Sequence, residues 1–254
     1  MTSQNIRVRY HNGVAQLNLH RPDQANALDL ELARAALLAL REAEHTPDVF
    51  VLSITGTGDY FCGGGDVKGM AAAHDKPAFL HELAEAAHEL VLAMVSSRLF
   101  IVSAVNGPAA GAGLGLVLNS DYVVASDRAK LMAAYAAIGL TPDSGVSYLL
   151  PRAVGYQRAM ELMLIGSTLD AQTAREWGLV NEVVTSEALE PRTIELCERL
   201  ASRAPQALAA TKKLARHEMI AEYRDHLALE SLRITKMVAR SDSQALIARF
   251  VAKG

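Results

Sequence analysis

The sequence is poor in cysteine and in aromatic residues. Its two cysteines, Cys62 and Cys197, stand far apart in a chain of 254 residues and form no CxxC pair. This spacing argues against a disulfide framework and against a zinc site, so we predict no bound metal. Aromatic residues make up 5% of the chain, which does not suggest a stacking platform for bases.

The chain also lacks a strong charge of either sign and a long apolar run. Its formal net charge is −3 and its pI about 6.2, whereas nucleic-acid binders usually show a basic domain or stripe. No run of 18 apolar residues occurs, which predicts no membrane span, and residues 1–13 contain no apolar core of signal-peptide length. We therefore expect a cytoplasmic protein with no nucleic-acid partner and no membrane contact. Half of the residues are hydrophobic, enough for one sizeable core.

Strands and helices alternate along the first part of the chain. Residues 6–10 and 14–19 alternate apolar and polar around His11-Asn12-Gly13, which predicts a hairpin. Asp29 suits the N-cap of a helix that runs to about Glu44. Further apolar patterns predict a buried strand, a long helix, a second buried strand and a returning strand over 50–55, 76–97, 100–105 and 121–125. This alternation indicates an α/β arrangement.

The last part of the chain shows helical periods only. From about Leu189 onward no strand pattern is found, and Pro205 suits the first turn of a helix. The tail has more apolar surface than one isolated helix can bury. We therefore expect an α/β core over residues 1–190 and a helical C-terminal subdomain over 191–254. The subdomain either folds back on the core or packs on another subunit.

Two glycine-rich segments each follow a buried strand. They are FCGGGD (61–66) and NGPAAGAGLGLVL (106–118), and neither has the spacing of a nucleotide-binding fingerprint. Glycine lets a backbone approach a ligand closely, and N–H groups at a helix start point outward. One N–H from each segment could bind a single carbonyl oxygen, as in an oxyanion hole. Close helix packing is the alternative explanation for this composition.

A third segment, IGLTPDSGVSYLLPR (138–152), has a turn signature around Asp143. Asp143 suits the N-cap of the helix that follows. The alternative is a functional carboxylate held at a junction between loop and helix. The residues alone leave both interpretations open.

In their order, these segments resemble the crotonase (enoyl-CoA hydratase/isomerase) superfamily over essentially the whole chain. The matching pieces are RPDQANAL (21–28), ITGTGDYFCGGGDVKGM (54–70), AVNGPAAGAGLGLVLNSD (104–121), the IGLTPDSG loop, AVGYQRAMELMLIGSTLDAQTAREWGLVNEVV (153–184) and the helical tail. The resemblance implies a β-β-α spiral core with a helical tail that supports homotrimers, often paired into hexamers. It also implies an acyl-CoA thioester substrate, with coenzyme A as part of the substrate and no permanently bound cofactor.

The resemblance also assigns site residues. It gives the two oxyanion N–H groups to Gly65 and Ala112, and Ala112 stands where many members have glycine. It implies main-chain contacts to the adenine and pantetheine of coenzyme A from two loops, by Gln24, Ala25, Ala27, Gly63, Gly64 and Asp66. Ile138 and Leu140, with Leu131 and Met132, are expected to form an apolar pocket around the acid residue.

The acid residues decide which reaction is expected. Hydratases of the family use two glutamates, and this chain has Gly115 and Tyr135 at those positions. Asp143 instead matches the single acid of several isomerase branches. The expected reaction moves a double bond from the 3- to the 2-position of an acyl-CoA, with an enolate held by the oxyanion hole and Asp143 as the proton shuttle.

Other chemistry remains open at this stage. In the 4-chlorobenzoyl-CoA dehalogenase branch an aspartate at this loop position attacks an aromatic ring, and His88 falls where that branch uses a histidine. That branch has a tryptophan where this chain has Tyr135, and an aromatic residue where this chain has Gly65. Both differences weaken the case for this branch. His88 is otherwise explained as a packed or hydrogen-bonded side chain of its helix. Hydratase-like activity and a catalytically silent acyl-CoA-binding protein are the remaining alternatives.

Overall fold

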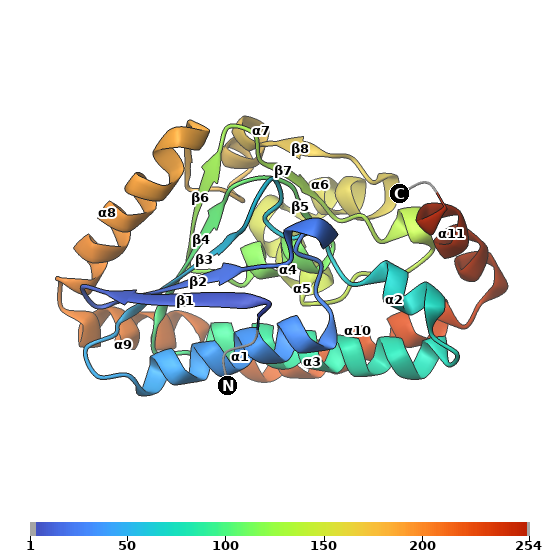
Figure 1. The fold of residues 1–254 in the computed structure, drawn as a ribbon, viewed down its shortest axis with the longest axis horizontal. Helices are drawn as coiled ribbons and strands as arrows, with labels where there is room; N and C mark the ends of the chain where they lie inside the picture. Colours follow the sequence, from blue (N-terminus) through green and yellow to red (C-terminus); the bar gives the residue numbers. More distant parts are fainter. Residues whose placement is uncertain (1–3, 253–254) are drawn as a thin grey trace.

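A six-stranded sheet forms the centre of the computed structural model, which describes residues 4–252 (Figure 1). Its order is β1-β2-β3-β4-β6-β9. The hairpin pair β1-β2 is antiparallel and every other neighbouring pair is parallel. The strands are β1 (Ile6–His11), β2 (Val14–Leu19), β3 (Val51–Gly56), β4 (Phe100–Val105), β6 (Tyr122–Ser126) and β9 (Glu182–Val184). The predicted strands are thus confirmed to within a residue or two.

The predicted hairpin has a physical cause in its two turn residues. Asn12 has φ 44° and Gly13 has φ 79°, which is the backbone form of a tight two-residue turn between antiparallel strands. A second, three-stranded sheet was not predicted. It consists of β5 (Ala109–Ala110), β7 (Lys130–Met132) and β8 (Leu169–Asp170).

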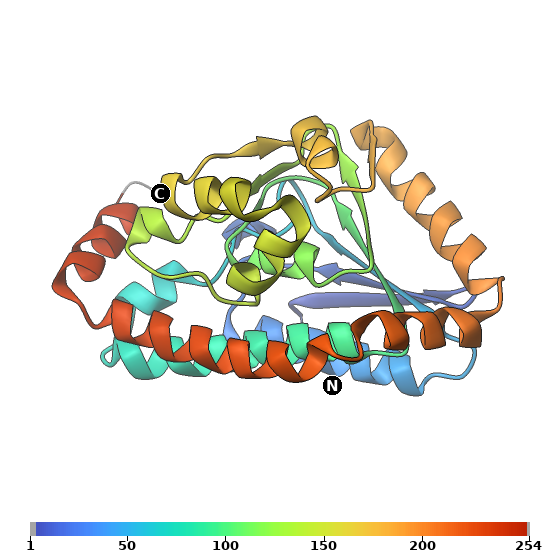
Figure 2. The same ribbon diagram turned by 180° about the vertical axis from the view of Figure 1, so that it is seen from behind.

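Helices cover both faces of the main sheet (Figures 1 and 2). The helix α1 (Leu30–His45) starts at Asp29, whose side chain accepts from the N–H of Leu32 at 2.7 Å, so the predicted cap is confirmed. It packs beside α3 (Lys76–Ser96), and α10 (Met219–Val238) runs along the other side of α3. The opposite face of the sheet is covered by α8 (Leu189–Ala201).

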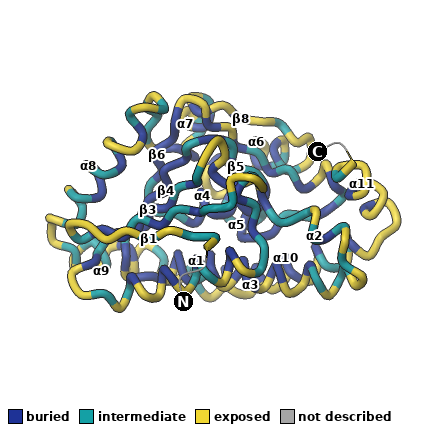
Figure 3. The backbone as a smooth tube through the Cα atoms, viewed as in Figure 1, coloured by how far each residue is buried: buried dark blue, intermediate teal, exposed yellow. Residues whose placement is uncertain are grey.

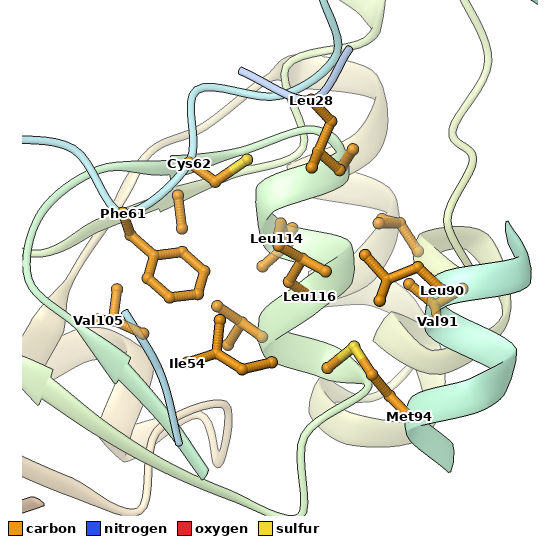
Figure 4. Packing of buried hydrophobic residues seen from close by; sticks show 14 of the residues in the cluster. Leu28, Ile54, Phe61, Cys62, Leu90, Val91, Met94, Val105, Leu114 and Leu116 are labelled. Carbon is orange, nitrogen blue, oxygen red and sulfur yellow. The ribbon is translucent and has the colours of Figure 1, made fainter. Parts of the chain in front are cut away.

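The small-residue helix α4 (Ala112–Leu118) lies inside the core. Figure 4 shows Leu114 and Leu116 of this helix between Phe61 on one side and Met94 of α3 on the other. All four side chains are fully buried or nearly so, and Figure 3 shows the surrounding backbone buried as well. A helix start in this position points its free N–H groups into the protein interior.

The C-terminal part is helical, as the sequence predicts. Within residues 4–252, no strand follows β9. Pro205 occupies the first turn of its helix, α9. The remaining helices are α2 (Val67–Ala72), α5 (Val146–Val154), α6 (Tyr156–Met160), α7 (Ala171–Glu176), α9 (Pro205–Arg216) and α11 (Ser241–Val251); short 3-10 turns span Pro22–Gln24, Ala136–Ile138 and Ser186–Ala188, and a π-helical turn spans Glu161–Ile165.

A buried lysine fastens this helical part to the core. Lys212 of α9 donates to the carbonyls of Met94 and Leu99, at 3.0 and 2.8 Å, and pairs with Asp121 at 2.7 Å. Burial lowers the pKa of Lys212 to about 8. The other oxygen of Asp121 pairs with Arg216 at 2.8 Å. Removing one partner of such a buried pair leaves an unpaired charge, so α9 is held in a defined position.

Across residues 4–252, we find no helix of the length and apolarity that crossing a membrane requires.

Candidate active site

A narrow cavity of about 80 Å³ collects the segments that the sequence singled out. Gly65, Ala112, Tyr135 and Asp143 all line it. The rest of its wall is mostly apolar and comes from both the core and the tail, namely Leu28, Val67, Met70, Leu80, Leu83, Ala87, Ile138, Leu140, Ile234 and Phe250. The structure therefore places the three predicted catalytic positions around one space.

The two glycine-rich segments are held in direct contact. The N–H groups of Phe61 and Cys62 both donate to the carbonyl of Pro108, and Ala110 donates back to the carbonyl of Cys62 at 3.0 Å. A side chain on Gly113 would place its Cβ 2.2 Å from that same Cys62 carbonyl. Glycine at 113 is thus required by the close approach of α4 to this segment.

The N–H groups of Gly65 and Ala112 are available to a ligand. Ala112 is the first residue of α4, so its N–H has no partner within the helix. Among the described residues, neither N–H donates a hydrogen bond to the protein. The turn before α4 uses Gly111 with φ 52° and ψ −119°, a conformation essentially restricted to glycine. Two free donors at the rim of one cavity are the arrangement expected of an oxyanion hole.

The loop predicted to bind coenzyme A lies against the first glycine segment. Gly63 donates to the carbonyl of Ala25 at 2.8 Å, and Leu28 donates to the carbonyl of Gly64 at 2.7 Å. Gln24 is exposed, Ala25 and Ala27 are half-buried, and Asp66 caps α2 by accepting from Gly69. The structure thus brings the six predicted contact positions into two adjoining loops.

Sequence reasoning missed the residue that fixes this loop, Asn26. It is fully buried with φ 51°. Its side chain donates to the carbonyls of Thr57 and Tyr60 and accepts from the N–H of Arg21. An asparagine next to a loop of Pro, Asp and Gln looks like ordinary turn composition, so only its burial distinguishes it.

Asp143 does not cap a helix, so that interpretation was wrong. The N-cap residue of α5 is Gly145, and no side chain caps this helix. Asp143 is 7% exposed, and its Oδ1 instead accepts from the Tyr135 hydroxyl at 2.6 Å and from the Ser144 hydroxyl at 3.1 Å. No described residue donates to the other oxygen, Oδ2. One oxygen of this carboxylate is therefore anchored while the other is free.

Tyr135 acts as a permanent donor to this carboxylate. Burial, followed by the nearby charge of Asp143, raises the pKa of the Tyr135 hydroxyl well above its usual value of 10. The hydroxyl consequently keeps its proton over the physiological pH range. Tyr135 both lines the cavity and is 6% exposed, so it is part of the pocket wall and is packed in the core as well.

His88 is buried directly behind the Asp143 loop. Its Nε2 accepts from the backbone N–H of Ser144 at 3.1 Å. Burial lowers the pKa of His88, although the neighbouring Asp143 acts in the opposite direction. The ring is therefore neutral with its proton on Nδ1, and the lone pair of Nε2 is already used. Of the two interpretations, the packed, hydrogen-bonded histidine fits this geometry.

The sequence as a whole matches a known protein family. The sequence pattern of the family described as enoyl-CoA hydratase/isomerase matches residues 9–254. The chain belongs to the enoyl-CoA hydratase/isomerase family.

Relatives within this family carry different names. The chain is 35% identical over 199 residues to a 4-chlorobenzoyl coenzyme A dehalogenase of Arthrobacter sp, covering 78% of this chain and 72% of the relative. It is 34% identical over 203 residues to the 1,2-epoxyphenylacetyl-CoA isomerase of Escherichia coli K12, covering 79% and 78%. The crystal structure of an enoyl-CoA hydratase from Mycobacterium avium subsp. paratuberculosis K-10 superposes with a TM-score of 0.89 at 30% identity, covering 97% and 98%. The crotonase fold is therefore established, and the reaction has to be argued from the site.

The site departs from the hydratase pattern of the family for a steric reason. A Cβ built on Gly115, where the family resemblance places one hydratase glutamate, would lie 2.6 Å from the Cβ of Ser144 and 2.9 Å from its carbonyl oxygen. The Asp143 loop thus occupies the space that a side chain at 115 would need. Tyr135 stands at the other glutamate position and donates to Asp143.

Some of the expected pocket residues lie elsewhere. Ile138 and Leu140 line the cavity, whereas Leu131 and Met132 do not. The strand β7 pairs with β5 and contributes main chain, because the carbonyl of Met132 accepts from the N–H of Gly111. No group of three or more His, Cys, Asp and Glu side chains that could hold a metal occurs in residues 4–252.

Proposed function

We propose that this protein is an acyl-CoA isomerase that converts a 3-enoyl-CoA into a 2-enoyl-CoA. The observation that carries the proposal is the free Oδ2 of Asp143 in the same cavity as the unpaired N–H groups of Gly65 and Ala112. A single base beside an oxyanion hole is what a reversible proton transfer next to a thioester carbonyl needs.

The steps follow from these groups. The thioester oxygen binds between the two N–H groups, and Oδ2 of Asp143 removes a proton from C2. The electron pair left behind spreads over the thioester and the double bond, with its negative charge on the bound oxygen. The protonated carboxyl then returns the proton at C4, the carbonyl re-forms, and the double bond lies between C2 and C3.

The lining of the cavity supports a hydrocarbon acyl group. Apart from Tyr135 and Asp143, the side chains around it are apolar. A hydroxylated acyl chain would leave its polar groups without partners there, which is costly. An apolar wall also excludes water, so the enolate is better stabilised by the two N–H groups than it would be in solvent.

Coenzyme A belongs to this proposal as part of the substrate. We infer that the main chain of residues 24–27 and 63–66 holds its adenine and pantetheine, as the family resemblance implies. The contact between the two loops, in which Gly63 donates to the carbonyl of Ala25 at 2.8 Å, supports this inference because it holds them side by side.

The direct test is incubation of the purified protein with a 3-enoyl-CoA, followed by the ultraviolet absorbance of the conjugated product. Formation of the 2-enoyl-CoA with no added cofactor supports the proposal. Tight binding of the thioester without turnover would contradict it and favour a silent acyl-CoA-binding protein.

A second candidate is an aryl-CoA enzyme in which Asp143 attacks the ring. The identity with the Arthrobacter dehalogenase favours it. The occupied Nε2 of His88 speaks against the assisting role that this chemistry would give to the histidine. Turnover of an aryl-CoA in water labelled with ¹⁸O distinguishes the two, because an ester on Asp143 exchanges its carboxylate oxygen and a proton shuttle does not.

The substitution Gly115→Glu tests the departure from the hydratases. We expect it to yield no hydratase and to lower the free energy of unfolding by about 1–3 kcal/mol, because the new side chain overlaps the Asp143 loop. Urea unfolding and addition of water to a 2-enoyl-CoA measure the two effects. A stable variant with new hydratase activity would show that the loop yields and that our steric argument fails.

We also infer that the tail packs on further copies of the chain, as the family resemblance implies. The helices α10 and α11 carry exposed apolar side chains, of which Leu229, Leu232 and Phe250 are 45%, 51% and 53% exposed. Large apolar side chains exposed on the same helical tail are costly in water, and they support an interface with another chain. Sedimentation equilibrium should give the mass of three or six chains of 27.3 kDa, whereas a monomer at micromolar concentration would disprove this inference.

A further inference from the structure

The short segment 143–147 is held from behind by three backbone hydrogen bonds to charged or ionisable side chains. The N–H of Ser144 donates to Nε2 of His88 at 3.1 Å. The N–H groups of Gly145 and Ser147 donate to the two carboxylate oxygens of Glu230, at 2.7 and 3.0 Å. These three hydrogen bonds, all within four residues of Asp143, determine where its backbone lies.

Glu230 reaches this segment from the tail. It lies on α10, is 3% exposed, and also accepts from the Ser147 hydroxyl. The family resemblance assigned no role to Glu230. Its place in the helical pattern of α10 is that of an ordinary core-facing residue. Glycine at 145 is required here too, because a Cβ would lie 1.9 Å from the hydroxyl of Tyr223, a neighbour of Glu230 on the same helix.

No permanent cation faces the Glu230 carboxylate among the described residues. From α3 it faces His88 at 3.9 Å, and from its own helix His226 at 3.8 Å. The pKa values of both histidines are lowered, chiefly by burial, so both are neutral near pH 7. Asp143, from the loop, adds a like charge. A carboxylate in such surroundings lowers the stability of the fold, and an uncharged side chain of the same size would make the fold more stable.

We propose that Glu230 and His88 are positioning residues that aim the carboxylate of Asp143 at the substrate by holding the backbone of residues 144–147. This inference rests on the proposed function, in which Asp143 moves the proton. It assigns to the tail a part in catalysis, because Glu230 comes from α10 and the base from the core.

Ionisation of Glu230 controls how firmly it can hold the loop. A carboxylate accepts from both N–H groups at once, whereas a protonated carboxyl presents a hydroxyl that clashes with one donor. Burial raises the pKa of Glu230 to about 7, with Asp143 acting in the same direction and the hydrogen bonds of Ser147 and Gly145 opposing them. The other titratable groups packed around it are His88, His226, Tyr135 and Tyr223.

The first test is the variant Glu230→Gln, which keeps the shape and replaces one acceptor by an N–H donor. We expect kcat for 3-enoyl-CoA to fall by about 10- to 100-fold, while KM stays within about twofold because the coenzyme A loops are untouched. Its matched control is Glu222→Gln. Glu222 lies on the same helix and is exposed. It accepts a hydrogen bond from the Tyr148 hydroxyl of α5 and has none to residues 143–147. Equal kcat in both variants would overturn the proposal.

The dependence of kcat on pH distinguishes a positioning role from a merely structural one, because a structural role would not change it. In the wild type, kcat should fall as the pH drops through about 7, where Glu230 takes up its proton. In Glu230→Gln this decrease should be absent, so that kcat is lower than in the wild type but changes little with pH. An unchanged decrease in the variant would assign the titration to another group and contradict the proposal.

His88 is tested by two substitutions of different chemistry. His88→Leu removes the acceptor of the Ser144 N–H and should lower kcat by about tenfold. His88→Gln offers an amide oxygen in its place and should restore most of the lost rate. A histidine that moved protons itself would lose activity equally in both variants, so equal losses would overturn the positioning role.

Amide hydrogen exchange without substrate separates this inference from the proposed function. The N–H groups of Gly145 and Ser147 should exchange faster in Glu230→Gln than in the wild type and in Glu222→Gln. Unchanged exchange disproves the anchoring whatever reaction the enzyme catalyses. Faster exchange in a protein without isomerase activity would keep the anchoring and reject the proposed function instead.

Discussion

Replacing Asp143 with asparagine should lower kcat for the 3-enoyl-CoA to 2-enoyl-CoA reaction by about a thousandfold or more. General base catalysis by a positioned side chain typically contributes about 10²- to 10⁴-fold, and no other carboxylate of residues 4–252 lines the cavity to replace this one. The amide oxygen of asparagine can still accept from Tyr135 and Ser144, which now hold Oδ1. The variant should therefore fold normally and keep its KM within a few-fold.

The measurement is steady-state kinetics on one substrate, with urea unfolding as a check on the fold. Asp225→Asn serves as the control, because Asp225 is exposed on α10 and should leave kcat unchanged. Residual activity of Asp143→Asn within tenfold of the wild type would remove Asp143 from the reaction. A loss of activity together with a loss of stability would instead show that the carboxylate is needed for the fold.

The substitution Gly113→Ala should lower kcat/KM by about a hundredfold or more without touching an acid or a base. The added Cβ would lie 2.2 Å from the carbonyl of Cys62, and both atoms belong to the backbone or are fixed to it. Either α4 or the segment before Gly65 has to move, and the two N–H groups then no longer converge on one oxygen. Loss of one oxyanion donor typically costs about 10²- to 10³-fold in kcat.

A glycine that meets no neighbour provides the matched control. Gly155 has φ 83°, and a Cβ there would find no atom within 4 Å. Gly155→Ala should therefore lower the free energy of unfolding by about 1–3 kcal/mol through backbone strain, with kcat/KM unaffected. If Gly113→Ala proves as active as Gly155→Ala, the contact between the two glycine segments does not maintain the oxyanion hole.

Ionisation of the buried Glu230 carboxyl has a cost for the stability of the fold. The pKa of Glu230 is raised from 4.5 to about 7, so between these values the folded protein holds a proton that the unfolded chain has lost. The contribution of Glu230 to the free energy of unfolding is then fully present below about pH 4.5 and is lost as the pH rises to about 7, by about 3–4 kcal/mol at most. The ionised form that holds the Asp143 loop is thus the less stable one, which fits a residue kept for function.

Much of this site was predictable from local sequence because its parts are main-chain devices. A glycine segment after a buried strand and a small-residue helix start suggest N–H groups that could face a ligand, and the family resemblance was needed to assign them to Gly65 and Ala112. The absence of acids at 115 and 135 could likewise be read directly. The family resemblance then assigned these segments to one active site before any distance between them was known.

The tertiary structure decided what holds the acid. The local pattern made Asp143 look like a helix cap, yet a hydroxyl eight residues earlier takes one of its oxygens and leaves the other free. Glu230 lies 83 to 85 residues from the N–H groups that it accepts from, and nothing near it in sequence marks it as special. Local propensity and glycine geometry depend on neighbours along the chain, whereas burial and hydrogen-bond partners depend on segments that only folding brings together.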